Sequence, residues 1–418
     1  MKSKEITEMN KNKTKSKQRI ENDRKANKKN AIFLLMVFGL VSLFGDIIYE
    51  GARSINGPYL SVLGANAVII GFVIGASELF GYLLRMLAGY FADKTKHYWL
   101  FVFLGYGLLI SIPLLSLSSL WQIAAILIIL ERVGKGLRSP ARDTIVSYAA
   151  KQIGTGIGFG FSEVLDQIGA ALGPIIIAIS FLSTKEVVTN ISSYQKAYSL
   201  LFIPFLALLI LLILAYIKVK SPEKLEEKKA KGFRINHSSI LSSYMLFSFF
   251  TTLGFVNFAL IGYHIKYNAI ASDAYIPMLY AFAMIVDGIF ALVLGAAYDR
   301  IKRDLEIKGE RKRKEFYLLL SLPIATTISL FFAFSSEFWI IVIGVFFWGF
   351  VMGTHETLMK AVIADITTKQ KRATSYGAFN TIYGIALFLG SSLAGILYEM
   401  NISYLISVML SFQIISIF

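Results

Sequence analysis

Residues 198–217, YSLLFIPFLALLILLILAYI, form a run of twenty residues without a single charged side chain. A helix needs about 20 predominantly apolar residues to cross the hydrocarbon core of a bilayer. The run is continuous and lacks the period-two alternation of a membrane β-strand. This stretch therefore predicts a membrane-spanning helix.

The rest of the chain repeats this pattern. Of its 418 residues, 56% are hydrophobic and 17% are charged, whereas about 25% are charged in soluble domains. The sequence predicts an all-α membrane protein and argues against a single-core soluble enzyme, a disordered chain and a nucleic-acid-binding domain. Twelve apolar segments are long enough to be spans: 31–61, 67–91, 98–118, 120–138, 156–182, 198–217, 240–264, 275–298, 316–335, 338–358, 376–397 and 401–418.

One long polar break, 218–239, separates the first six spans from the last six. The residues before the first span are also polar, and 11 of them are Lys or Arg. We therefore expect four parts, which are a basic tail (1–29), a six-helix bundle (30–218), a linker (219–239) and a second six-helix bundle (240–418).

The positive charges fix the expected orientation. If the N-terminus is cytoplasmic, the tail and the loops on its side hold 35 of the 42 Lys and Arg residues, and the other side holds only Lys185, Lys196 and Lys266. Loops that remain in the cytoplasm are enriched in Lys and Arg. We expect a multi-pass protein of the plasma membrane with both termini in the cytoplasm, and no nucleic-acid partner despite the net charge of +15.

Residues for cofactor chemistry are scarce. The chain has no Cys and four His, none of which pair at the spacing of metal ligands. The glycine run at 154–160 fits no nucleotide-binding motif, and no ATPase motif is present. We expect no metal, no cofactor and no enzymatic activity.

A short motif occurs twice. The segment G-Y-F-A-D-K at 89–94 follows the second span, and G-A-A-Y-D-R at 295–300 follows the eighth, 206 residues later. An internal repeat at this spacing indicates two similar six-helix bundles, a common construction of transporters. With this repeated motif, residues 30–418 resemble the major facilitator superfamily.

The resemblance implies twelve helices in two halves, which carry a small solute by alternating access, and we expect a monomer. In that family the motif residues, here Gly89, Asp93, Gly295 and Asp299, contribute to a cytoplasmic gate. The basic residues Arg138 and Arg142 of the predicted loop 138–151 would belong to the same gate. The alternative is that the two motif acids only cap a helix or pair with a neighbouring base.

The fifth span contains Gly169, Gly173 and Pro174 in a G-x-x-x-G-P arrangement. This resembles a motif of antiporter-type exporters in the same superfamily. Close helix packing at a small-residue pair, with a kink at the proline, is the alternative.

Charged residues inside the spans are the candidate site, because each costs about 3 kcal/mol to insert unless it meets a partner or a cavity. Asp46, Glu50 and Arg53 lie within about 60° of one another around the first helix and therefore share a face. The remaining candidates are Glu78, Arg85, Glu131, Arg132, Asp166 and Asp287.

Two interpretations of these charges remain open. They could form internal ion pairs that hold the helices together, or they could bind a proton or a charged solute near the membrane centre. Acids outnumber bases, and burial of a surplus carboxylate favours its neutral form. Asp46, Glu50 and Asp166 are therefore the best candidates for a proton site.

The sequence thus predicts a secondary transporter of a small solute that works by alternating access and is coupled to protons. Its partners would be the solute, the proton and the lipid bilayer. An uncoupled facilitator, and a transporter-shaped receptor or scaffold that moves nothing, are the alternatives.

Overall fold

The computed structural model describes residues 2–150, 155–183, 190–222, 239–307, 314–367 and 372–418. These residues are overwhelmingly helical and include no strand. The helices before the break between the halves are α1 (Lys2–Val62), α2 (Ala67–Thr95), α3 (Tyr98–Gly107), α4 (Ser111–Leu114), α5 (Trp121–Ala150), α6 (Thr155–Leu182), α7 (Ile191–Leu200) and α8 (Phe202–Lys218). Those after it are α9 (Ser239–Leu253), α10 (Phe258–Tyr267), α11 (Tyr275–Ile307), α12 (Ser321–Ala333), α13 (Phe338–Ile366), α14 (Arg372–Met400) and α15 (Ile402–Ile417).

The described helices account for twelve membrane crossings, as predicted. Nine helical segments are both long and apolar enough to span a bilayer, and Tyr317–Ala333 and Ile402–Ile417 are apolar but shorter. The twelfth, α5, is 30 residues long but carries four charged residues within its first 18. Short 3₁₀ turns, η1 (Leu108–Ile110) and η2 (Leu115–Leu117), join α3 and α4 into one crossing, and η4 (Lys314–Leu320) leads into α12.

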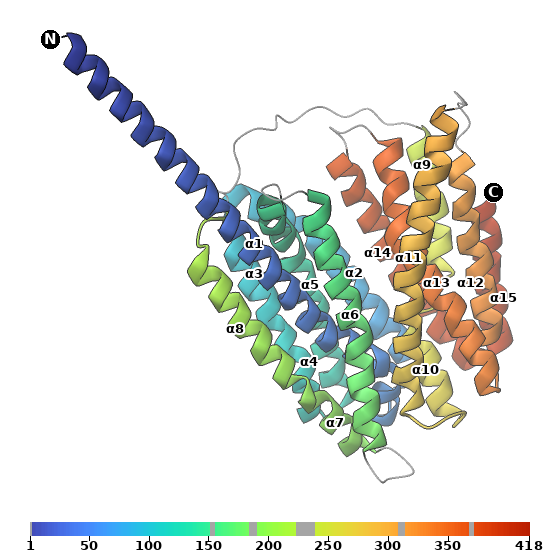
Figure 1. Ribbon diagram of the computed structural model, residues 1–418. Coiled ribbons are helices and arrows are strands. Elements are labelled where there is room, and N and C mark those ends of the chain that lie inside the picture. The colour runs from blue at the N-terminus through green and yellow to red at the C-terminus, as the bar shows by residue number, and fades with distance from the viewer. Residues whose placement is uncertain (1, 151–154, 184–189, 223–238, 308–313, 368–371) are drawn as a thin grey trace.

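The ends of several helices differ from the predicted ones. The predicted loop at 138–151 is wrong, because α5 continues through Pro140 to Ala150. The seventh span is two helices, since the chain breaks at 254–257 and Asn257 caps α10 by accepting a hydrogen bond from the Leu260 amide at 3.2 Å. At the N-terminus α1 begins at Lys2, so the basic tail continues directly into the first span and projects beyond the bundle (Figure 1).

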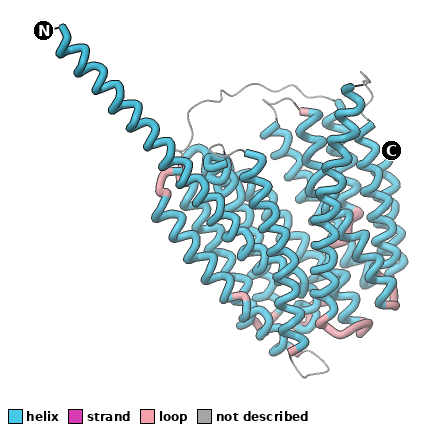
Figure 2. Tube along the Cα trace, viewed as in Figure 1, coloured by secondary structure: helices cyan, strands magenta, loops and turns pink. Residues whose placement is uncertain are grey.

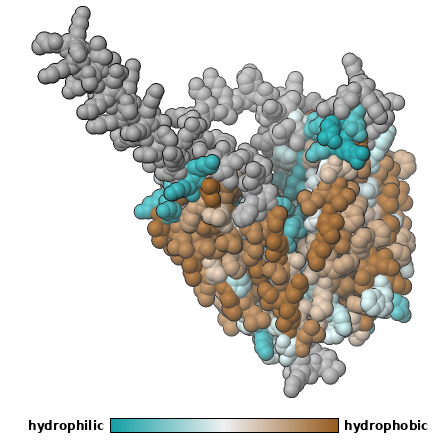
Figure 3. Space-filling view, viewed as in Figure 1, coloured by the Kyte–Doolittle hydropathy of each residue, from teal (hydrophilic) through white to brown (hydrophobic). Residues whose placement is uncertain are grey.

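Helices α1–α8 gather on one side of the molecule and α9–α15 on the other (Figures 1 and 2). The most extensive contacts between the two halves are those of α2 with α14, α6 with α11, and α1 with α10. The face of the bundle seen in Figure 3 is predominantly hydrophobic along the length of the helices, as expected for a surface that faces lipid. Residues 223–238, most of the predicted linker, lie outside the described residues.

Small residues let helices within the first half approach closely. A Cβ at Gly169 of α6 would stand 2.9 Å from the Cβ of Asp46, and one at Gly173 would stand 2.8 Å from the Gly51 amide. Both contacts are with α1, so the G-x-x-x-G pair lies in the α1–α6 crossing. Pro174 follows inside the helix.

The bundle has two distinct ends. We call the end that carries Lys218 and Ser239 the linker end, and the other the far end. At the far end the halves are in contact, and Gly57 of α1 lies so close to Ala259 of α10 that a Cβ would overlap its carbonyl oxygen. Glu399 of α14 also accepts a hydrogen bond from the Ala67 amide at the start of α2, at 2.8 Å.

A buried polar cluster adds to this closure. The Tyr194 hydroxyl of α7 donates to the Asp273 carboxylate of the second half at 2.7 Å. The Lys266 ammonium pairs with the same carboxylate at 2.6 Å. The far end is therefore closed by a tight contact between backbones and by two hydrogen bonds to carboxylates, one of them from the buried Tyr194.

Candidate functional site

A cavity of about 980 Å³ lies between the two halves. Its walls reach Asp143, Asp299 and Lys360, which lie towards the linker end of their helices. Figure 3 shows hydrophilic side chains between the two hydrophobic surfaces in this part of the molecule. Since the far end is closed, the cavity opens towards the linker end.

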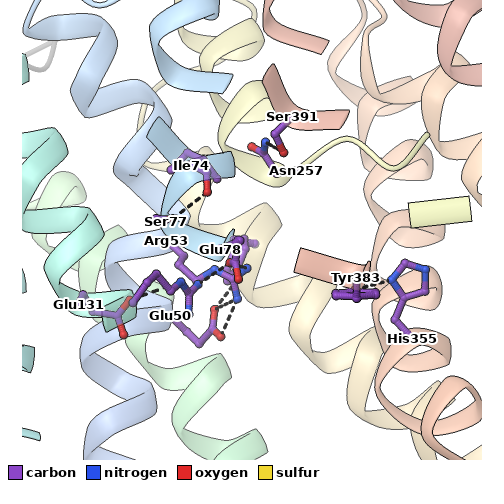
Figure 4. A network of polar contacts seen from close by, with 12 residues as sticks. Glu50, Arg53, Ile74, Ser77, Glu78, Glu131, Asn257, His355, Tyr383 and Ser391 are labelled. Carbon is purple, nitrogen blue, oxygen red and sulfur yellow. Dashed lines mark hydrogen bonds and ion pairs between the residues drawn. The ribbon is translucent and has the colours of Figure 1, made fainter. Parts of the chain in front are cut away.

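Ion pairs line the first-half wall of the cavity (Figure 4). Arg53 of α1 contacts Glu50 at 3.1 Å and Glu78 of α2 at 3.3 Å. Arg132 of α5 contacts Glu78 at 3.0 Å and Glu131 at 3.5 Å. Glu50, Arg53, Glu78, Arg132 and Glu131 thus form one chain of alternating charge across three helices, which we call the ion-pair network.

Glycines bring two of these helices close enough for the network to form. A Cβ at Gly136 of α5 would stand 2.7 Å from the carbonyl oxygen of Gly81 in α2. This crossing lies about one turn from Glu78 and Arg132 and positions their side chains to meet. The network also reaches the second half, because the Tyr280 hydroxyl of α11 donates to Glu50.

The arginines predicted to lie in a gating loop have other surroundings. Arg138 is buried inside α5, where it contacts Glu131 at 3.6 Å and donates to the Gly105 carbonyl at 3.4 Å. Arg142 pairs with Asp166 of α6 at 3.3 Å. The prediction that these two arginines lie in a loop is wrong, because α5 continues beyond Pro140.

Asp46 differs from the other acids of the first half. Its side chain lines the cavity and the residue is only 8% exposed. No Lys or Arg nitrogen of the described residues lies within ion-pair distance of its carboxylate. The titratable groups around it come from several helices and include Tyr49, Glu50, Tyr106, Lys135, Arg142 and Asp166. Lys135 lies over the Tyr49 ring, 3.9 Å from its centre.

Arg85 was predicted as one of the charged residues of the candidate site. It lines the cavity but forms no ion pair with a described residue, and it lies over the Tyr82 ring at 5.3 Å. Its Nε atom is buried without a hydrogen-bond partner in the structure.

The second-half wall has a different character. Asp287 of α11 is 3% exposed, and its Oδ1 has no hydrogen-bond partner among the described residues. Glu356 and Lys360 of α13 also line the cavity. His355 Nδ1 forms a hydrogen bond with the Tyr383 hydroxyl at 2.8 Å. The side-chain amide of Asn257 donates to the Ser391 hydroxyl at 3.0 Å (Figure 4).

The repeated motif occupies equivalent places in the two halves. Gly89 of α2 faces Pro140 of α5, and Gly295 of α11 faces Thr357 of α13. Asp93 accepts a hydrogen bond from the Tyr98 hydroxyl at 3.2 Å, and Asp299 lines the mouth of the cavity. In the described residues neither acid forms an ion pair with the other half, in keeping with an open linker end.

Several residues of the site were missed by the sequence analysis. Tyr280, Tyr49 and Tyr383 are members of an abundant residue type, and nothing in their spacing separates them from tyrosines that face lipid. Asp273 lies in a short loop and Tyr194 lies near the start of α7, so neither residue stands out in the sequence as a polar group within a span.

The arrangement suits binding and conformational change better than covalent chemistry. Among the described residues, no group of three His, Cys, Asp or Glu side chains is placed to hold a metal ion. The cavity has a polar interior between two bundles with apolar outer surfaces, acids without an ion-pair partner on both walls, and access from one end.

Comparisons with known proteins agree with this architecture. The crystal structure of the nucleoside transporter NupG superposes with a TM-score of 0.62 at 16% identity, over 92% of this chain and 96% of its own. A D-xylose-proton symporter superposes with a TM-score of 0.63 at 16% identity, over 93% and 96% of the two chains. An uncharacterised protein of Mycobacterium tuberculosis is 34% identical over 390 residues, 91% of this chain and 90% of the relative.

A family model matches residues 31–391, nearly the whole chain. Its description is the Major Facilitator Superfamily, whose members carry small solutes. Family and fold therefore describe a multi-pass membrane transporter. The protein belongs to the Major Facilitator Superfamily.

Proposed function

We propose that the protein is a proton-coupled secondary transporter that carries a small solute through the central cavity. It would lie in the plasma membrane with both termini cytoplasmic, as the distribution of Lys and Arg favours. The linker end then faces the cytoplasm, and the structure corresponds to an inward-open state. Segments 30–218 and 240–418 would be the two moving units, joined by 219–239.

The observation that carries this proposal is Asp46. A carboxylate that is buried in the wall of a solute cavity without an ion-pair partner can gain a proton and become neutral, or lose it and become charged. Alternating access would expose it to one side of the membrane and then to the other. Such a group is what coupling to a proton gradient requires.

The other two acids favoured by the sequence are less suitable. Glu50 has Arg53 and the Tyr280 hydroxyl as partners, and Asp166 has Arg142. Each carboxylate would have to break its ion pair with an arginine before it could bind a proton. We therefore assign the proton to Asp46 and a structural role to the ion-pair network.

The proposal also explains why the far end of the bundle is closed while the linker end is open. The far-end contacts would exist only in the inward-open state, and the motif acids Asp93 and Asp299 would engage the opposite half only after the linker end closes. An uncoupled facilitator would use the same two states, so the difference between the two functions lies in Asp46.

Transport by purified protein in lipid vesicles tests the proposal. A panel of labelled metabolites is offered with and without an imposed pH gradient, and at least one should accumulate only with the gradient. Asp46→Asn should abolish accumulation but retain exchange of the same solute across the membrane. Asp304→Asn, an exposed change on α11 outside the cavity, is the matched control. Accumulation by Asp46→Asn at the parent level would favour the uncoupled facilitator.

A further inference from the structure

The second-half wall of the cavity carries an acid with nothing to neutralise it. Asp287 is almost completely buried, lines the cavity and has an Oδ1 atom without a hydrogen-bond partner in the described residues. Burial of an unpaired carboxylate is costly. A group in this condition is best explained by a ligand that the cavity receives.

The surroundings of Asp287 define the charge of that ligand. The charged groups around it include Glu356, Glu50, Glu163 and the base Lys360. Glu50 is already paired with Arg53, but Glu356 and Glu163 have no ion-pair partner among the described residues. In the second-half lining of the cavity the acids Asp287, Asp299 and Glu356 outnumber the base Lys360, so this side should attract a cation.

A glycine lets α13 approach α11 closely at this acid. A Cβ at Gly353 would stand 2.5 Å from the Asp287 carbonyl oxygen and 3.1 Å from Oδ1. The contact between α11 and α13 thus encloses Oδ1, and the carboxylate meets the cavity at its other side.

Aromatic side chains complete this wall. Phe255 and Trp348 are stacked with ring centres 5.6 Å apart and an interplanar angle of 26°, and both line the cavity. Phe379 and Tyr383 line it as well, with ring centres 5.6 Å apart. Aromatic faces attract cations and also accept the apolar part of a solute.

We infer that the solute is an organic ammonium compound with an apolar or aromatic group. Its ammonium lies at Asp287 with Glu356 nearby, and its apolar part lies against Phe255 and Trp348. An inorganic cation would leave these aromatic surfaces without a role, and an anion would meet uncompensated carboxylates. The cavity, at about 980 Å³, is large enough for a solute of this kind with some water.

The inference rests on the proposed transport role of the cavity, but not on the assignment of the proton to Asp46. Equilibrium binding therefore tests it separately. Isothermal titration calorimetry on the full-length protein in detergent at neutral pH compares benzylammonium, benzyl alcohol and benzoate. These probes share a ring and differ in charge.

Benzylammonium should bind saturably, with a dissociation constant of roughly 1 mM or tighter. The alcohol and the acid should bind about tenfold more weakly or worse. Asp287→Asn should weaken benzylammonium binding by about tenfold or more, because it removes the charge at the ammonium. Asp304→Asn, an exposed change on the same helix, should bind like the parent.

A further variant keeps the test decisive. Glu356 is exposed to the cavity, so Glu356→Gln should fold even if Asp287→Asn does not, and it should weaken benzylammonium binding severalfold. Equilibrium binding in detergent requires no proton movement across a membrane, so its outcome is independent of the coupling proposal. No saturable binding up to roughly 10 mM, equal binding of benzyl alcohol, or unchanged binding in both the Asp287 and Glu356 variants would overturn the inference.

Discussion

Removal of one hydroxyl at the far end should shift the balance between the two states of the transporter. Tyr194 is fully buried, and its hydroxyl donates to Asp273 across the halves at 2.7 Å. Tyr194→Phe keeps the ring, which packs on Tyr59 and Phe181, and deletes only the donor. The variant should therefore destabilise the inward-open state without disturbing the first half.

The size of the shift follows from the nature of the bond. A hydrogen bond to a charged group contributes about 1.5–3 kcal/mol, which corresponds to a factor of roughly 10 to 150 in an equilibrium constant. If the parent holds the inward-open state at about 99:1, the ratio becomes between roughly 90:10 and 40:60. Both changes are large enough to detect as a second population.

Distances between spin labels measure these populations. The chain has no native Cys, so Ser192→Cys in α7 and Ser272→Cys in the second half can be labelled as a pair without background. The parent should show mainly the short distance, and Tyr194→Phe should add a longer one. Tyr198→Phe is the control, because it deletes an equally buried hydroxyl whose partner, Asn56, lies in the same half.

Two results would contradict this reasoning. If the Tyr194→Phe distances match those of the parent, the bond does not stabilise the closed far end. If the control shows the same added distance, the effect comes from general loosening of the first half and not from the contact between halves.

Three other changes have definite expected outcomes. Glu78→Gln should lower the free energy of unfolding by about 3 kcal/mol, because the buried Arg132 and the half-buried Arg53 lose a shared partner; chemical denaturation in detergent measures this, and an unchanged midpoint would show that the network does not stabilise the fold. Gly57→Val should prevent closure of the far end and lengthen the spin-label distance, whereas Gly107→Ala, which has open space, should not; equal distances in both variants would contradict the tight contact. A Cys at Ser272 should react with an impermeant reagent from outside the cell and one at Ser221 should not, and the reverse pattern would invert the proposed topology.

The sequence predicts much of the fold because the membrane imposes a simple rule on it. Each span must be apolar for about 20 residues, and that requirement can be seen along a single chain. The helix ends were less predictable. Residues 138–150 are polar enough for a loop, yet they continue α5, because Arg138 donates to the Gly105 carbonyl of α3 and Arg142 pairs with Asp166 of α6.

The site was only partly predictable for a related reason. Residues on one helix face can be identified from spacing, so Asp46, Glu50 and Arg53 were expected to lie together. Which acid meets which base depends on how helices rotate against one another. That rotation depends on close crossings such as Gly81 with Gly136, and Asp166 meets Arg142 across α5 and α6. Spacing within one helix does not contain this information.

The central claim is that solute and proton move together through the cavity, and the most direct test measures both in the same vesicles. Purified protein is reconstituted with a pH-sensitive dye inside, no pH gradient is imposed, and the transported solute is added outside. Solute entry in the parent should be accompanied by a change of internal pH, while Asp46→Asn should show solute exchange without proton movement. Solute entry in the parent with no change of internal pH would contradict the account.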